Sequence, residues 1–159
     1  MNINSEMFRE YDIRGIFGED LNGEVAYLIG KAFGTKMREL NISTTVVGYD
    51  NRLSSVELEN NLVKGILETG IDIISIGLCT TPMYYYACIK LKVFSGVMVT
   101  ASHNPKDDNG FKFAFDESGN CKGQEIQDFL EYILKGEFSI GEGKISEYDI
   151  TEDYLELFR

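Results

Sequence analysis

The fold is decided by residues 93–99 (VFSGVMV), which run directly into residues 100–105 (TASHNP). The first segment is nearly continuous in apolar and β-branched character, which is typical of a strand covered on both faces. A second strand is predicted at residues 111–115 (FKFAF), where phenylalanines alternate with Lys112 and Ala114. Residues 100–105 are therefore expected to form a polar loop at the carboxyl end of a buried strand.

Outward from these two strands, the chain alternates further strands and helices. Residues 44–49 and 71–78 are apolar runs rich in β-branched residues, which predicts two more covered strands. This alternation predicts a three-layer α/β/α sandwich with a mixed, mostly parallel sheet of about four main strands. Apolar spacing and capping residues predict four helices. The first runs from the cap at Asn22 to Leu40, and the second from the capping-box pair Ser54 and Glu57 to Gly70. The third starts at Thr81-Pro82, and the fourth runs from about Gly123 to Lys135.

The C-terminal part of the chain differs from the rest. We assign residues 1–135 to one α/β/α domain, because 159 residues suffice for one full core and are too few for two. Residues 136–159 form an acidic segment whose helix, starting at Thr151, stops after roughly two turns, short of the mean of about 11–12 residues. We interpret it as a truncated helix that leads to absent domains. Its exposed apolar side chains are expected to promote self-association.

Composition excludes several classes of function. The formal net charge of -11 argues against a nucleic-acid partner. No run approaches the roughly 18 apolar residues of a membrane span, so we expect no membrane partner. The first residues lack the basic start and apolar core of a secretory signal. Three cysteines without metal-ligand spacing indicate a reduced, cytoplasmic protein.

Reactive side chains gather in loops that leave the predicted strands. Ligands of open α/β sheets collect outside the carboxyl ends of the strands. Residues 50–52, 79–81 and 102–104 follow three such ends, and residues 11–15 form a fourth candidate loop. One edge of the domain could thus gather a hydroxyl, an imidazole and two guanidinium groups.

Several interpretations of these residues are open. Ser102 could bond its own backbone, act as a hydrolase nucleophile with His103, or carry a phosphate held by nearby cations. The hydrolase hypothesis is disfavoured because adjacent side chains seldom make that contact and the nucleophile elbow is missing. Lys112 could face solvent, or it could orient a phosphate and exchange a proton with a hydroxyl. Arg14 and Arg52 could form surface salt bridges or remain available to an anionic substrate.

Five segments together resemble a known family. Residues 100–105 and 109–112 (NGFK) are similar to the active-site signature of the α-D-phosphohexomutases. Residues 8–15 (FREYDIRG), 48–54 (GYDNRLS) and 80–82 (TTP) resemble three further segments of the phosphomannomutase/phosphoglucomutase branch. The resemblance covers essentially the whole chain, in order.

The resemblance implies an isomerase that interconverts hexose 1-phosphate and hexose 6-phosphate through a 1,6-bisphosphate intermediate. It implies a phosphoserine at Ser102, proton transfer by Lys112 with help from His103, and a catalytic arginine at Arg14. The residues that it implies for substrate binding are Tyr11, Arg14, Ser102 and Asn104.

The resemblance also implies Mg²⁺, bound in part by the phosphate on Ser102, and an activating hexose 1,6-bisphosphate. Family members have four domains, and this chain resembles only the first, so we expect the chain alone to have little or no mutase activity. The hexose could be mannose, glucose or glucosamine, of which the N-terminal pattern favours the first two. The alternatives are a stand-alone phosphosugar-binding or regulatory module and, third, a serine hydrolase.

Overall fold

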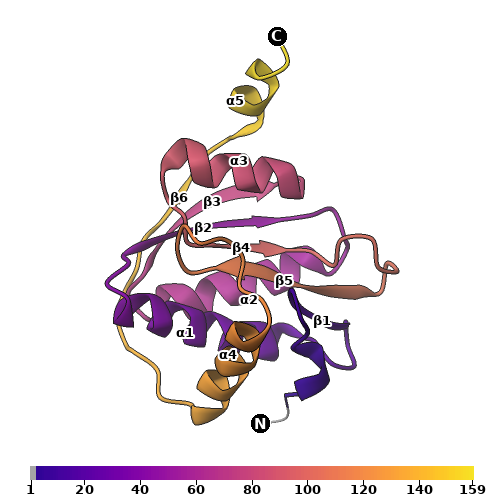
Figure 1. Cartoon of the computed structure of the whole chain (residues 1–159), viewed down its shortest axis with the longest axis vertical. Helices are drawn as coiled ribbons and strands as arrows, with labels where there is room; N and C mark the ends of the chain where they lie inside the picture. The colour runs from indigo at the N-terminus through magenta and orange to yellow at the C-terminus, as the bar shows by residue number, and fades with distance from the viewer. Residues whose placement is uncertain (1–2) are drawn as a thin grey trace.

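A computed structural model describes residues 3–159, and its centre is a six-stranded sheet with the order β1-β5-β4-β2-β3-β6 (Figure 1). Strands β2, β3, β4 and β6 pair in parallel, whereas β5 runs antiparallel to both of its neighbours, β4 and β1. The strands are β1 Ile13–Ile16, β2 Thr44–Tyr49, β3 Asp72–Leu78, β4 Gly96–Val99, β5 Asp108–Ala114 and β6 Ile145–Glu147.

Helices cover both faces of the sheet, as Figure 1 shows. The larger core lies between one face and three helices, and a smaller core lies between the other face and α3. The three helices of the larger core are α1 Gly23–Glu39, α2 Ser55–Leu67 and α4 Gln124–Lys135. The remaining helices are α3 Thr81–Leu91, the short α5 Thr151–Glu156 and the 3₁₀ turn Ser5–Met7.

The predicted α/β/α architecture is confirmed, but the sheet has six strands and not about four. The sequence prediction missed both edge strands. Residues 11–15 were expected to form a loop, yet Ile13–Ile16 is β1, a strand too short to show a clear alternation. All three residues of β6 are exposed, so no apolar pattern marks this strand in the sequence.

Two of the predicted helix caps differ in detail. Asn22 caps α1 as predicted, because its side chain accepts a hydrogen bond from a backbone N–H of the first turn. Ser54 precedes α2 but makes no capping hydrogen bond; its Oγ accepts one from Asn109 instead, so the capping box does not form. Helix α3 is capped by Thr80, one residue before the predicted start.

The apolar side chains near the end of the chain are only partly uncovered. Tyr154 packs against Tyr86 of α3, with ring centroids 5.9 Å apart. Leu155, Leu157 and Phe158 are exposed, as expected. No helix within residues 3–159 has the length and apolar character that a membrane crossing requires.

Gly110 fixes the contact between β1 and β5, and this contact places Arg14 at the site described below. A Cβ atom at Gly110 would lie 1.9 Å from the Ile13 carbonyl oxygen, so no side chain fits there.

We predict that Gly110→Ala lowers the free energy of unfolding by about 1–3 kcal/mol, the usual cost of overpacking. Urea denaturation would measure it. The matched control is Gly23→Ala, whose Cβ would meet only the movable end of the Asn61 side chain; equal stability of the two variants would contradict the prediction.

Candidate functional site

The site lies where β4 and β2 end at the same edge of the sheet. A groove of about 880 Å³ opens there between the loop that follows β4, the loop that joins β2 to α2, and the turn after β1. Ser102 and Asn104 of the first loop line it, together with Lys106. The structure thus confirms that a polar loop follows β4 and places it beside the residue 50–52 segment.

Ser102 has an unusual backbone conformation. Its φ angle of +56° lies in the left-handed region, which costs a residue with a Cβ atom about 1–2 kcal/mol. Its N–H donates to Thr100 Oγ1 at 3.0 Å. Such a conformation persists only where surrounding contacts fix it. The loop around Ser102 is therefore held in one shape by its neighbours.

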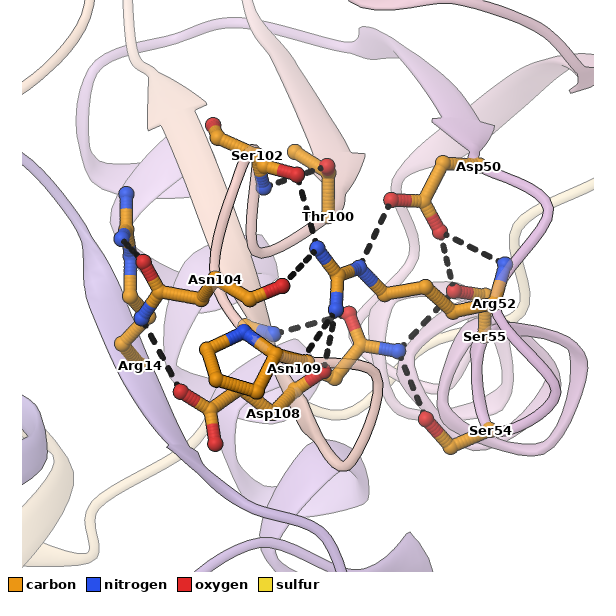
Figure 2. Close-up of polar contacts among 12 residues, drawn as sticks. Arg14, Asp50, Arg52, Ser54, Ser55, Thr100, Ser102, Asn104, Asp108 and Asn109 are labelled. Carbon is orange, nitrogen blue, oxygen red and sulfur yellow. Dashed lines mark hydrogen bonds and ion pairs between the residues drawn. The ribbon is translucent and has the colours of Figure 1, made fainter.

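Arg52 supplies most of those contacts (Figure 2). Its Nη2 donates to the backbone carbonyl oxygens of Ser102 at 2.7 Å and Asn104 at 3.0 Å. Its Nη1 donates to the carbonyl oxygens of Pro105 at 2.7 Å and Asp108 at 3.1 Å. One planar guanidinium therefore binds three carbonyl groups of the loop and that of Asp108 at the start of β5, and it fixes the path of the backbone through Ser102.

Asp50 orients this guanidinium. Its Oδ2 accepts a hydrogen bond from Arg52 Nε at 3.3 Å, and its Oδ1 accepts one from Ser55 Oγ at 2.6 Å. Ser55 Oγ in turn accepts from Asn109 Nδ2 at 2.9 Å. The side chains of Arg52 and Asp50 are only 11% and 18% exposed, so solvent screens this ion pair less than a surface pair. The start of α2, the end of β2 and the start of β5 are joined by this network.

Arg52 has no donor left for a substrate. A guanidinium has five N–H donors, and those of Arg52 meet five acceptors, namely Asp50 and the four backbone carbonyls named above. The expectation that Arg52 could be available to an anionic substrate is therefore wrong. Its positive charge still contributes to the electrostatic potential beside Ser102.

Arg14 approaches the same loop from β1. Its guanidinium pairs with Asp12 at 2.7 Å and donates to the side-chain oxygen of Asn104. Asn104 Nδ2 donates to the carboxylate of Asp108 at 3.0 Å. Arg14 and Asn104, two of the predicted site residues, are thus in contact. Asn104 lies two residues after Ser102 in the chain.

Lys112 lies on the same face of the sheet as Arg14. In the antiparallel registers, Lys112 is opposite Met98 and Arg14 is opposite Gly110, which puts Arg14 and Lys112 at diagonal positions roughly 7–8 Å apart. This is the α3 side of the sheet, because Phe111 packs in the larger core. The half-buried Lys112 amine makes no hydrogen bond or ion pair within residues 3–159, so it can interact with a ligand.

His103 and Tyr11 are both exposed, Tyr11 by 69%. Within the part of the chain that the structure describes, neither ring forms a hydrogen bond with Ser102. The serine–histidine contact that a hydrolase needs is therefore not formed.

The described residues do not form a metal site by themselves. Among residues 3–159, no group of three or more His, Cys, Asp or Glu side chains converges closely enough to hold a metal ion. The three cysteines are buried, and burial raises the pKa of the Cys79 and Cys121 thiols to about 12, so they are poor metal ligands and nucleophiles.

The sequence prediction missed the supporting residues of the site. Asp50 and Arg52 were noticed because they follow a buried strand, but nothing in their spacing indicates that Arg52 binds backbone carbonyls. The sequence assigns Ser55 only to a helix start, and it assigns Asn109 to the segment 109–112 that resembles the active-site signature, without a contact to Ser54 or Ser55. Such contacts depend on loops that are distant in sequence.

We predict that Arg52→Lys opens the loop. A lysine keeps the charge, but its single ammonium has three donors at one point and cannot bind all five acceptors. The carbonyls left without a partner should lower the free energy of unfolding by about 2 kcal/mol or more. Amide hydrogen exchange of residues 100–108 should accelerate, as mass spectrometry would measure. Arg9→Lys on the exposed surface is the control. An Arg52→Lys protein with unchanged stability and exchange would contradict this assignment.

The chain is similar to proteins of one family. Residues 5–139 match the family described as phosphoglucomutase/phosphomannomutase, alpha/beta/alpha domain I. A phosphoglucomutase of Neisseria meningitidis is 41% identical over 156 residues, which cover 97% of this chain and 34% of that protein. A phosphomannomutase/phosphoglucomutase of Pseudomonas aeruginosa is 38% identical over 155 residues, covering 98% of this chain and 33% of that protein. The chain thus spans about a third of the length of these relatives.

Solved structures show the same fold. A phosphoglucomutase/phosphomannomutase family protein of Burkholderia thailandensis superposes with a TM-score of 0.88 at 35% identity, over 98% of this chain and 35% of that one. A putative phosphomannomutase of Thermus thermophilus gives a TM-score of 0.80 at 28% identity, over 94% of this chain and 34% of that one. The chain belongs to the phosphoglucomutase/phosphomannomutase family and corresponds to its α/β/α domain I.

Proposed function

We propose that this chain carries the phosphoserine of a mutase that interconverts the 1-phosphate and 6-phosphate of a hexose, mannose or glucose. The observation that carries the proposal is the loop around Ser102, which Arg52 fixes at the mouth of an open groove. The Ser102 hydroxyl makes no hydrogen bond within residues 3–159, so it can carry a phosphate. The relatives named above support the hexose phosphates as substrates.

The proposed reaction transfers one phosphoryl group in each direction. A hydroxyl oxygen of the sugar phosphate attacks the phosphorus on Ser102, and the bond between phosphorus and Ser102 Oγ breaks as the new one forms. The product is a hexose 1,6-bisphosphate and a free serine. After the bisphosphate reorients, Ser102 Oγ attacks its other phosphate and the phosphoserine is restored. Lys112 is proposed to exchange the hydroxyl protons, with His103 assisting.

The fold supports this chemistry chiefly by positioning. Phosphoryl transfer depends on placing the reacting oxygens in line and on neutralising charge. Arg14 and Lys112 share one face of the sheet, and Arg14 reaches the Ser102 loop through Asn104. We propose that Tyr11, Arg14 and Asn104 contact the substrate. Arg52 supports the loop and is not assigned to the substrate.

Mg²⁺ and an activating hexose 1,6-bisphosphate belong to the proposal as the expected ion and activator. The phosphate on Ser102 would supply one ligand to the ion, since the described residues alone do not form a metal site. Since the chain spans about a third of its relatives, we propose that residues 1–159 alone complete the full mutase cycle slowly or not at all, and retain only the single transfer of a phosphate to Ser102. Self-association through α5, a cytoplasmic location and a division of the chain after residue 135 also remain proposals.

The first test is the site of phosphorylation. We predict that incubation with glucose 1,6-bisphosphate and MgCl₂ adds one phosphate to the chain, and that fragmentation by mass spectrometry places it on Ser102. Ser102→Ala should abolish the label. Ser118→Ala, in an exposed loop, should keep it. A label on another residue would contradict the proposal, and binding of glucose 1-phosphate without any label would favour a phosphosugar-binding module.

The second test concerns proton transfer. We predict that Lys112→Met slows phosphorylation of Ser102 by about 100-fold or more, within the usual range for loss of a general acid–base group. The variant should fold normally, because the Lys112 amine has no partner within residues 3–159. Lys122→Met is the control, since Lys122 is exposed in the loop after β5. An unchanged rate of labelling, followed by intact-mass measurement, would remove Lys112 from the mechanism.

A further inference from the structure

A second groove, of about 640 Å³, lies away from Ser102. It runs along the edge of the sheet between α2, β3 and β6. Glu59 and Val63 of α2 line one side, and Ser75 of β3 and Glu147 of β6 line the other. None of the chemistry proposed above uses it.

Glu59 is the notable residue of this groove. It is only 7% exposed, yet its carboxylate makes no hydrogen bond or ion pair within residues 3–159. Burial raises the pKa of this carboxyl group. Its oxygens are not among the fully enclosed side-chain atoms that lack a partner, so the carboxylate opens into the groove while the rest of the side chain is buried. This partial desolvation disfavours the charged form. A cation beside Glu59 would offset that cost.

Further carboxylates line the same groove. In the parallel register of β3 and β6, Ser75 pairs with Glu147, so both side chains project to the α2 side of the sheet. Asp149 lies two residues after Glu147, and its Oδ1 accepts a hydrogen bond from the backbone N–H of Thr151. The lining contains these acidic residues and no lysine or arginine.

The lining fits an organic cation better than a metal ion. The acidic side chains do not converge, since no group of three or more within residues 3–159 could hold a metal. The lining also contains the ring of Tyr49, which packs on the α2 side of the sheet, and the exposed side chain of Leu78. Aromatic faces attract ammonium and guanidinium groups, and apolar walls accept an alkyl chain.

We propose that the groove between α2, β3 and β6 binds an organic cation, with an alkylammonium or guanidinium head beside Glu59 and Glu147 and an alkyl chain along Leu78. Such a group could come from a free polyamine or from a lysine or arginine side chain of a polypeptide. The proposal is independent of the mutase reaction, because no residue of the groove belongs to the Ser102 site.

The test is a titration of the whole ¹⁵N-labelled chain, followed by NMR. Spermidine represents free polyamines, and N-acetyl-arginine amide represents a polypeptide side chain. Either should cause saturable shifts of the backbone amides of Glu59, Ser75 and Glu147. Glu59→Gln and Glu147→Gln should each weaken binding about tenfold, the loss expected when a charge-assisted contact is removed. Glu142→Gln, exposed and outside the groove, should bind like the parent chain.

Each outcome is decisive. Tighter binding of spermidine assigns the groove to a polyamine, and tighter binding of the arginine derivative assigns it to a polypeptide side chain. The proposal is overturned if neither probe causes saturable shifts, or if the two glutamine variants bind like the parent. It is also overturned if MgCl₂ at equal ionic strength reproduces the shifts, because that result shows general screening of charge. Glu147 lies on an exposed strand, so its variant tests the groove even if Glu59→Gln fails to fold.

Discussion

The contact on which the site depends joins the guanidinium of Arg52 to four backbone carbonyls, three in the loop after β4 and one at the start of β5. A loop at the end of a strand has carbonyl groups that no sheet partner satisfies. Here one side chain satisfies three of them, and Asp50 holds that side chain in place. The left-handed conformation of Ser102 is maintained by this arrangement and by Thr100. The proposed nucleophile is therefore fixed before any substrate arrives, which lowers the entropic cost of reaction.

The sheet brings the remaining groups to the same place. Arg14 pairs with Gly110, and Gly110 and Lys112 are two residues apart on β5, so Lys112 and Arg14 come to one face of the sheet. Gly110 allows the backbone of β1 to approach β5 closely enough for this. Arg52 and Arg14 have different roles, as their hydrogen bonds show. Arg52 uses all five donors within the protein, whereas Arg14 bonds only side chains, those of Asp12 and Asn104, and could exchange such contacts for a phosphate.

The sequence predicts the layers of the fold and the position of the Ser102 loop, because buried strands and amphipathic helices leave strong local patterns. The sheet edges could not be predicted in this way. Strand β1 is only four residues long, and β6 is exposed along its whole length. The hydrogen-bond partners of Arg52 and Ser54 also could not be predicted from the sequence. Ser54 precedes α2 with a capping pattern, yet Asn109, 55 residues away, takes its hydroxyl. Contacts of this kind form only when distant loops meet.

The central claim is that the loop is a preformed carrier for a phosphate on Ser102, with Arg52 as its support. A crystal structure of the chain phosphorylated on Ser102 tests it most directly. The account predicts that residues 100–105 keep their path and that Arg52 still binds the carbonyls of Ser102, Asn104, Pro105 and Asp108. The phosphate should lie on the side of Arg14 and Lys112. A structure in which Arg52 leaves these carbonyls to bind the phosphate, and the loop takes another path, would contradict the account.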